Sequence, residues 1–320
     1  MVKNSIKTCR ITCGLAIIAA GILIGALFIS ADKDVGQEQL QKVNEGLKYS
    51  VYPVHHPAEL EFAGEKVPLG YFDVMEDLDR ELLINVYWQS HTMLLIKRAN
   101  RYFPVIESVL KKHGIPADLK YIAVAESDLS NLVSPRQAVG FWQFLEGTAK
   151  DYSLEVNSEV DERYHIEKST EAACIFLKES YQRYGSWTMA AASYNMGRKG
   201  LDEQIGRQKT DYYYDLLLNE ETGRYLYRLL AMKLILTNPE EYGFYAEAKD
   251  LYPSIPIYEV TIDGPVEDFA DFATRYGINY KVLKIFNPWL RDKQLLNPKK
   301  QTYYIQIPKG GMDGRDLSDF

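Results

Sequence analysis

The sequence contains few of the residues from which metal centres and disulfide frameworks are built. Its 320 residues include 3 cysteines and 5 histidines. Cys9 and Cys13 lie beside an N-terminal apolar run and Cys174 stands alone, so neither a disulfide framework nor a metal-ligand spacing is present. The adjacent His55 and His56 have no third ligand nearby, which favours a solvated loop over a metal site. We therefore expect no metal and no other cofactor.

The sequence also lacks an excess of positive charge. Its net charge is -7 and its pI is about 5.4, which argues against broad nucleic-acid binding. A hydrophobic fraction of 46% and a charged fraction of 25% are ordinary for a folded protein. Tyrosine is abundant, with 24 residues against 12 phenylalanines. Its flat apolar ring and polar tip suit sugar rings as well as wet surfaces.

A long uncharged run extends from Ile11 to Ser30 and follows Lys3, Lys7 and Arg10. A run of this length can span a bilayer, and its basic flank should remain in the cytoplasm. We therefore expect residues 1–31 to anchor the chain in the inner membrane through residues 11–30, with the remainder on the periplasmic face. A cleaved signal peptide, which would release the chain into the periplasm, is the alternative.

The remainder of the chain divides by its periodicity. Residues 32–75 have mixed charge and little periodicity, which predicts a linker with weak local structure. Residues 76–250 are mainly helical in pattern. Their lead-in, 76–113, should be broken or kinked into two helices at Pro104.

A separate small domain is predicted at the C-terminal end. Residues 255–310 follow a strand–helix–helix–strand pattern, and residues 311–320 are predicted to be a flexible tail. The fold class is therefore mainly α, with a small α+β domain after the helical one.

The helical part is centred on a carboxyl group within an apolar stretch. Pro116 suits the start of a helix, and Leu119, Ile122 and Glu126 then follow at the spacing of one helix face. Burial of Glu126 would disfavour its charged form and raise its pKa, as a general acid near neutral pH requires. A buried glutamate satisfied by a structural partner is the alternative for this residue alone.

Two further motifs combine aromatic and amide side chains. Gly140-Phe141-Trp142-Gln143 follows a polar loop, and Tyr194-Asn195-Met196-Gly197 ends an alanine-rich helix. Aromatic rings beside amides suit a sugar-binding cleft. Phe141 and Trp142 are alternatively core residues.

In this order, the pair Glu126-Ser127 and the two motifs resemble the lysozyme-like catalytic domain of lytic transglycosylases, over roughly residues 100–240. The resemblance implies that Glu126 is the catalytic acid/base. It also implies that Ser127, Gln143, Tyr194 and Asn195 contact the substrate.

A later stretch, Glu221-Thr222-Gly223-Arg224-Tyr225, looks like the family's Glu-Thr-x-x-Tyr motif, whose tyrosine, here Tyr225, lines the cleft. Two departures from the family pattern affect loop shape and substrate subsites. Ser193 replaces the usual alanine before Tyr194, and Arg136-Gln137 replaces a small Ala-Gly pair.

The C-terminal unit resembles a LysM domain, a module that binds chains containing N-acetylglucosamine. Phe272-Ala273, Tyr276-Gly277-Ile278, Leu283 and Asn287-Pro288 carry the match. Gly264-Pro265-Val266 stands in place of the usual Gly-Asp-Ser/Thr entry to the first helix.

Together these resemblances imply cleavage of the β-1,4 bond between N-acetylmuramic acid and N-acetylglucosamine in peptidoglycan, with formation of 1,6-anhydromuramyl ends. The expected partners are peptidoglycan glycan strands. The alternatives are a lysozyme-type hydrolase, a non-catalytic peptidoglycan-binding protein and a purely structural envelope protein.

Overall fold

The computed structural model describes residues 51–310, and those from Val54 onward belong to one compact unit. The predicted N-terminal anchor, the first part of the predicted linker and the predicted tail lie outside the described residues. None of the helices in residues 51–310 combines the length and the apolarity that a membrane crossing requires.

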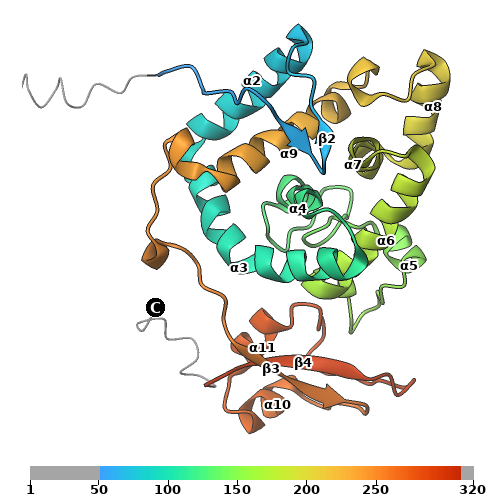
Figure 1. The fold of residues 1–320 in the computed structure, drawn as a ribbon. Helices are drawn as coiled ribbons and strands as arrows, with labels where there is room; N and C mark the ends of the chain where they lie inside the picture. Colours follow the sequence, from blue (N-terminus) through green and yellow to red (C-terminus); the bar gives the residue numbers. More distant parts are fainter. Residues whose placement is uncertain (1–50, 311–320) are drawn as a thin grey trace, which may run out of the picture. The chain divides into compact units, whose positions relative to one another are not determined.

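The larger, helical part of the described chain follows the predicted fold class (Figure 1). Its α-helices are α2 (Phe72–Tyr87), α3 (Gln89–His113), α4 (Lys120–Ser127), α5 (Glu146–Asp151), α6 (Ile166–Tyr184), α7 (Trp187–Met196), α8 (Arg198–Gln208) and α9 (Glu220–Thr237). Short 3₁₀ helices lie between or after them: η1 (Ala117–Leu119), η2 (Glu162–Tyr164), η3 (Tyr213–Asp215), η4 (Pro239–Tyr242) and η5 (Ala248–Asp250).

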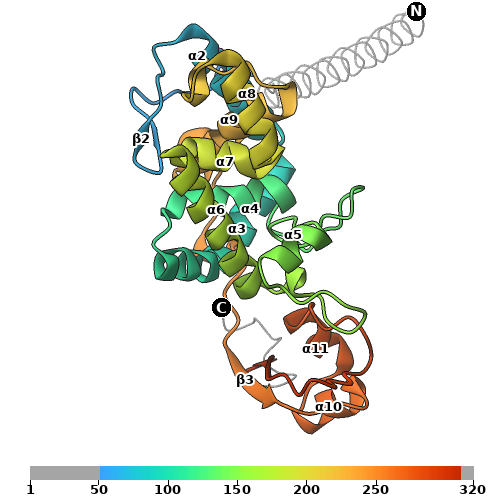
Figure 2. The same ribbon diagram turned by 90° about the vertical axis from the view of Figure 1, so that its right-hand side faces the viewer.

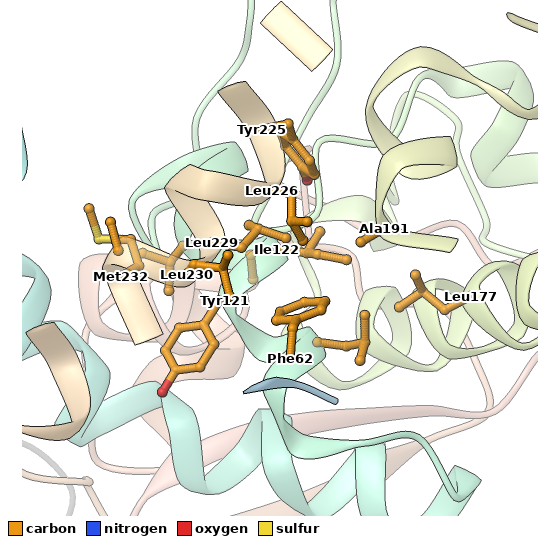
Figure 3. Close-up of a cluster of buried hydrophobic side chains, with 14 of the residues drawn as sticks. Phe62, Tyr121, Ile122, Leu177, Ala191, Tyr225, Leu226, Leu229, Leu230 and Met232 are labelled. Carbon is orange, nitrogen blue, oxygen red and sulfur yellow. The ribbon is translucent and has the colours of Figure 1, made fainter. Parts of the chain in front are cut away.

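The short helix α4 lies at the centre of this part and contacts α3 and α9, while α9 also contacts α2 and α7 (Figure 1). Apolar side chains from these elements form one core, in which Ile122 is fully buried. Figure 3 shows Ile122 close to Leu226 and Leu229 of α9. Isolated eight-residue helices are unstable in water, so tertiary packing of this kind is what stabilises α4.

The structure shifts the start of this central helix. Pro116 was predicted to begin it, but Pro116 is extended and precedes η1, so that α4 begins at Lys120. Asp118 accepts a hydrogen bond from the Ala63 backbone N–H at 2.8 Å and pairs with Lys233 at 2.8 Å. These tertiary contacts hold Asp118 in the 3₁₀ turn that directly precedes α4.

The lead-in breaks at Trp88, so the prediction of a break at Pro104 is wrong. Thr92 Oγ1 donates to the Asn85 carbonyl at 2.5 Å, which satisfies one carbonyl at the end of α2. Pro104 lies inside α3 and is exposed. The Asn100 carbonyl that loses its helical partner therefore lies on the solvent side, where water can satisfy it.

The prediction of weak local structure in the linker is wrong for residues 61–66, which form a hairpin of β1 (Glu61–Phe62) and β2 (Glu65–Lys66). Phe62 is fully buried in the core, as Figure 3 shows. The Glu65 carboxylate accepts hydrogen bonds from the backbone N–H groups of Trp187 and Thr188 at the start of α7. A carboxylate at a helix N-terminus is favoured by the helix dipole.

The C-terminal unit has the predicted strand–helix–helix–strand order: β3 (Ile257–Ile262), α10 (Phe269–Arg275), α11 (Tyr280–Phe286) and β4 (Tyr303–Pro308). The two strands pair antiparallel, with Ile257 opposite Pro308 and Ile262 opposite Tyr303. Its own core is apolar and includes Val160 from the helical part. The segment around Val160 therefore contacts both cores, because Leu154 packs in the helical core and Val160 in the C-terminal one. The Asp161 N–H also donates to the Trp289 carbonyl at 2.9 Å.

Candidate active site

Glu126 stands in the last turn of α4, at the wall of a cleft of about 630 Å³. The loop that follows α4, the α5 region, the end of α7 and the start of α9 form the other walls, and Figure 2 shows this loop in green beside α5. The side chains and backbone lining the cleft belong to Glu126, Ser134, Pro135, Arg136, Ala138, Gln143, Phe144, Leu145, Thr148, Phe176, Tyr194, Asn195, Met196, Gly197 and Glu221.

Burial raises the pKa of Glu126 from its ordinary 4.5 to about 7. The neighbouring Glu221 raises this pKa further, whereas a hydrogen bond from Tyr225 and the charge of Arg228 lower it. Desolvation is the largest of these effects, and it raises the pKa because burial disfavours the charged carboxylate more than the neutral acid. Glu126 is half-buried, and its pKa is raised as the helical spacing predicted, so near pH 7 a large fraction of Glu126 is protonated.

Tyr225 lies behind Glu126, away from the cleft wall where the sequence placed it. Its ring belongs to the buried face of α9 and is only 2% exposed. Its hydroxyl donates to Glu126 Oε1 at 2.7 Å. This bond fixes the carboxyl orientation and leaves Oε2 as the oxygen that can carry a transferable proton.

Tyr194 and Asn195 both line the cleft, at the end of α7. The Tyr194 hydroxyl donates to the Trp142 carbonyl at 2.7 Å, and burial raises its pKa well above 10, so it stays protonated. Asn195 Oδ1 accepts a hydrogen bond from Thr222 Oγ1 at 2.8 Å. This leaves the Asn195 side-chain NH₂ as a donor for a ligand in the cleft.

Gln143 lines the cleft from a tight turn that begins at Gly140. Its side-chain nitrogen donates to the carbonyls of Gly140 at 2.8 Å and Leu132 at 3.2 Å, which leaves Oε1 as an acceptor. Its φ of 49° is in the left-handed region, which costs a non-glycine residue about 1–2 kcal/mol. Phe141 and Trp142, beside it, are core residues.

Ser127 does not line the cleft, although the resemblance implied a substrate contact. It is buried, with its Oγ 2.8 Å from the Phe141 carbonyl and 3.0 Å from the Ala123 carbonyl. Successive helix residues point about 100° apart, so Ser127 faces the interior when Glu126 faces the cleft. Its hydroxyl ties α4 to the turn that holds Gln143.

A buried ion pair supports the loop beneath the cleft. Arg163 binds both carboxylate oxygens of Asp161, at 2.9 and 2.7 Å, and donates to the carbonyls of Gln137 at 3.2 Å and Phe144 at 3.3 Å. Gly140 has φ +82°, and a Cβ there would lie 2.0 Å from the Arg163 carbonyl oxygen. Sequence patterns gave no signal for this support, because the carbonyls that Arg163 binds lie 26 and 19 residues away in the chain.

Two charged residues of the cleft were not assigned roles from the sequence. Glu221 was noted only as the first residue of its motif, and Arg136 only as a departure from the family pattern. Asp128, the nearest second carboxylate in the sequence, does not line the cleft and pairs with His91 at 3.0 Å. Within residues 51–310 there is no cluster of three or more His, Cys, Asp or Glu side chains that could hold a metal ion.

Comparison with known proteins agrees with this arrangement. Residues 103–216 match the transglycosylase SLT domain, and residues 258–311 match the soluble lytic transglycosylase C-terminal LysM-like domain. Membrane-bound lytic murein transglycosylase D of Escherichia coli strain K12 is 28% identical over 261 residues, which cover 79% of this chain and 56% of that protein. A putative tributyltin chloride resistance protein of Alteromonas sp. strain M-1 is 29% identical over 117 residues, covering 36% of this chain and 56% of that protein.

The chain thus spans little more than half the length of the curated relatives it matches. The matched SLT segment includes Glu126, Gln143, Tyr194 and Asn195, the residues that the fold brings together around one cleft. The chain therefore contains a transglycosylase SLT domain followed by a LysM-like domain, and it is homologous to membrane-bound lytic murein transglycosylase D of Escherichia coli.

Proposed function

We propose that this protein is a peptidoglycan lytic transglycosylase that cleaves the β-1,4 bond between N-acetylmuramic acid and N-acetylglucosamine. The observation that carries this proposal is the carboxyl group of Glu126, with its pKa raised to about 7 and its Oε1 held by Tyr225, at the wall of an open cleft. The homology to a lytic murein transglycosylase supplies the substrate class.

In the first step, Glu126 acts as the general acid. The proton on Oε2 passes to the glycosidic oxygen while the bond from that oxygen to the muramyl anomeric carbon breaks. The N-acetylglucosamine side leaves with a free 4-hydroxyl, and positive charge develops on the muramyl ring. The resulting Glu126 carboxylate is stabilised by the hydrogen bond from Tyr225.

In the second step, the same carboxylate acts as the base. It removes the proton from the 6-hydroxyl of the muramyl residue, whose oxygen then bonds to the anomeric carbon of its own ring. The product is a 1,6-anhydromuramyl end, no water is consumed, and Glu126 regains its proton. The Asn195 amide and Gln143 Oε1 are a donor and an acceptor for sugar groups in the cleft.

Mass spectrometry of fragments released from purified sacculi tests this function. The wild-type protein should release fragments with anhydro ends, and Glu126→Gln should release almost none, because the amide carries no transferable proton at the required strength. Asp128→Asn is the matched control, since it removes a neighbouring carboxylate outside the cleft and should retain cleavage. Substantial cleavage by Glu126→Gln would contradict the assignment.

Hydrolysis of the lysozyme type is the second candidate, because Glu221 places another carboxylate on the cleft wall. Most glycosidases use two carboxylates, one of which activates water or attacks the sugar. Hydrolysis adds one water to each new end, so the product mass separates the two reactions. We expect Glu221→Gln to keep anhydro products, whereas hydrated products that disappear in this variant would establish hydrolysis.

We further propose that the protein acts in the cell envelope, anchored by residues 11–30 or released into the periplasm if that segment is cleaved. The LysM-like domain is proposed to hold glycan strands. A pull-down with intact peptidoglycan that shows binding by both wild type and Glu126→Gln, but soluble fragments from neither, would instead favour a non-catalytic wall-binding protein.

A further inference from the structure

The cleft carries an unbalanced set of charged side chains. Glu126 and Glu221 supply its carboxyl groups, and Arg136 is the one cationic side chain among the described residues that line it. Arg136 is exposed to solvent. Its guanidinium is therefore available to a ligand in the cleft that Glu126 also lines.

Arg136 stands at the tip of a turn that is held on both sides. The Gln137 N–H donates to the Ser134 carbonyl at 2.9 Å, which closes the turn over Pro135 and Arg136. The Ser134 N–H donates to the Ala138 carbonyl at 2.8 Å, and the Ala138 N–H donates to Ser134 Oγ at 3.0 Å. Pro135 restricts the backbone just before Arg136. These hydrogen bonds therefore hold the Arg136 backbone in one position at the edge of the cleft.

The base of this turn is also held from below. Gln137 has φ 62°, a left-handed conformation that is unfavourable for a residue with a side chain. Its carbonyl accepts a hydrogen bond from the buried guanidinium of Arg163, which is itself paired with Asp161. A fixed backbone reduces the conformational entropy that Arg136 loses when it binds a ligand.

We propose that Arg136 is a specificity-determining residue that binds a carboxylate on the muramyl side chain of the substrate. This inference rests on the proposed function, because the N-acetylated sugar rings of the glycan are themselves neutral. Two carboxylates are available in such a substrate: the lactyl carboxylate of a muramyl residue without a peptide, and a carboxylate of an attached stem peptide. The planar guanidinium of arginine matches either group through paired hydrogen bonds.

Equilibrium binding in the catalytically inactive Glu126→Gln background tests this role without turnover. The probes are peptide-free glycan strands, the same strands with lactyl carboxylates converted to neutral methylamides, and strands that retain their stem peptides. Adding Arg136→Gln should weaken binding about fivefold on strands that carry the recognised carboxylate, the size expected for a partly exposed ion pair. Binding to the neutral methylamide strands should be unchanged.

The probe that responds identifies the source of the carboxylate. A loss on peptide-free strands assigns the lactyl group, and a loss confined to peptide-bearing strands assigns the stem peptide. Arg207→Gln is the matched control, because Arg207 is exposed on α8 and does not line the cleft. Arg136→Lys should recover part of the lost affinity, since it keeps the charge but not the planar fork.

An equal loss on neutral and charged strands, or no loss on any strand, would overturn the role of Arg136. Failure of the proposed function has a different signature, in which wild type releases no anhydro ends from sacculi. The binding measurement still decides the role of Arg136 in that case, because it does not depend on cleavage. Absence of binding to every strand, even by the parent Glu126→Gln protein, would also overturn the role of Arg136, whereas the release of anhydro ends by wild type decides the proposed function separately.

Discussion

Replacing Glu126 with glutamine should make the protein more stable at pH 8, although it should abolish cleavage. Burial raises the pKa of Glu126 from 4.5 to about 7, so the folded state binds this proton more tightly than the unfolded state does. Stability from this group is fully present below about pH 4.5 and is lost as the pH rises through 7. Above pH 7 the folded protein must hold a desolvated carboxylate.

The size of the effect follows from the pKa. Each pKa unit corresponds to about 1.4 kcal/mol, so the rise from 4.5 to about 7 amounts to a cost of about 3 kcal/mol at pH 8. Glutamine carries no charge to desolvate, and its side-chain oxygen can still accept the hydrogen bond that Tyr225 donates to Oε1. The variant should therefore exceed wild type in unfolding free energy by about 3 kcal/mol at pH 8 and by less than about 1 kcal/mol at pH 5.

Urea unfolding followed by tryptophan fluorescence at pH 5, 6.5 and 8 measures this difference. Both proteins are compared at each pH, so the titration of all other groups cancels. Asp128→Asn serves as the control for a carboxylate outside the cleft, and its difference from wild type should not grow with pH in this way. A constant difference across the range, or a wild type that is the more stable at pH 8, would refute a raised Glu126 pKa.

Two other substitutions test the surroundings of the acid. Tyr225→Phe removes the hydrogen bond that stabilises the Glu126 carboxylate, so the pKa of Glu126 should rise. The alkaline limb of the pH–rate profile should then move up by about one pH unit while the maximal rate falls, and an unmoved limb would contradict this. Gly140→Ala places a Cβ 2.0 Å from the Arg163 carbonyl oxygen and should lower the free energy of unfolding, measured in urea, by about 3 kcal/mol. Gly185→Ala, also at positive φ but in open space, should lower it by only about 1 kcal/mol. Equal losses would rule out the contact as the cause.

Short-range chemistry explains why several features were predictable from the sequence. The helix ends at Gly114 and Gly185 follow from the left-handed conformation that glycine adopts most easily. Ser186 caps α7 through a bond to the Met189 N–H, as its position predicts. The strand–helix–helix–strand order of the C-terminal unit follows from alternating and helical apolar patterns.

The failures of prediction share a different cause. Pro104 was expected to break a helix, but its exposed position leaves the freed carbonyl to solvent. Residues 61–66 have too few apolar positions to show a pattern, and only the burial of Phe62 makes them part of the core. Both outcomes depend on which side of a segment faces the core, and that is set by elements distant in the sequence.

The same division applies to the candidate site. The sequence by itself determined the helical class, the two domains, the position of Glu126 on an apolar stripe and the order of the motifs, since each depends on spacing along one segment. Only the tertiary structure decided that Tyr225 lies behind the acid and Ser127 in the interior, and that Arg136 and Glu221 share its cleft. A pKa near 7 and a charged cleft arise from burial and from contacts between segments about 100 residues apart, and such contacts exist only after the chain has packed.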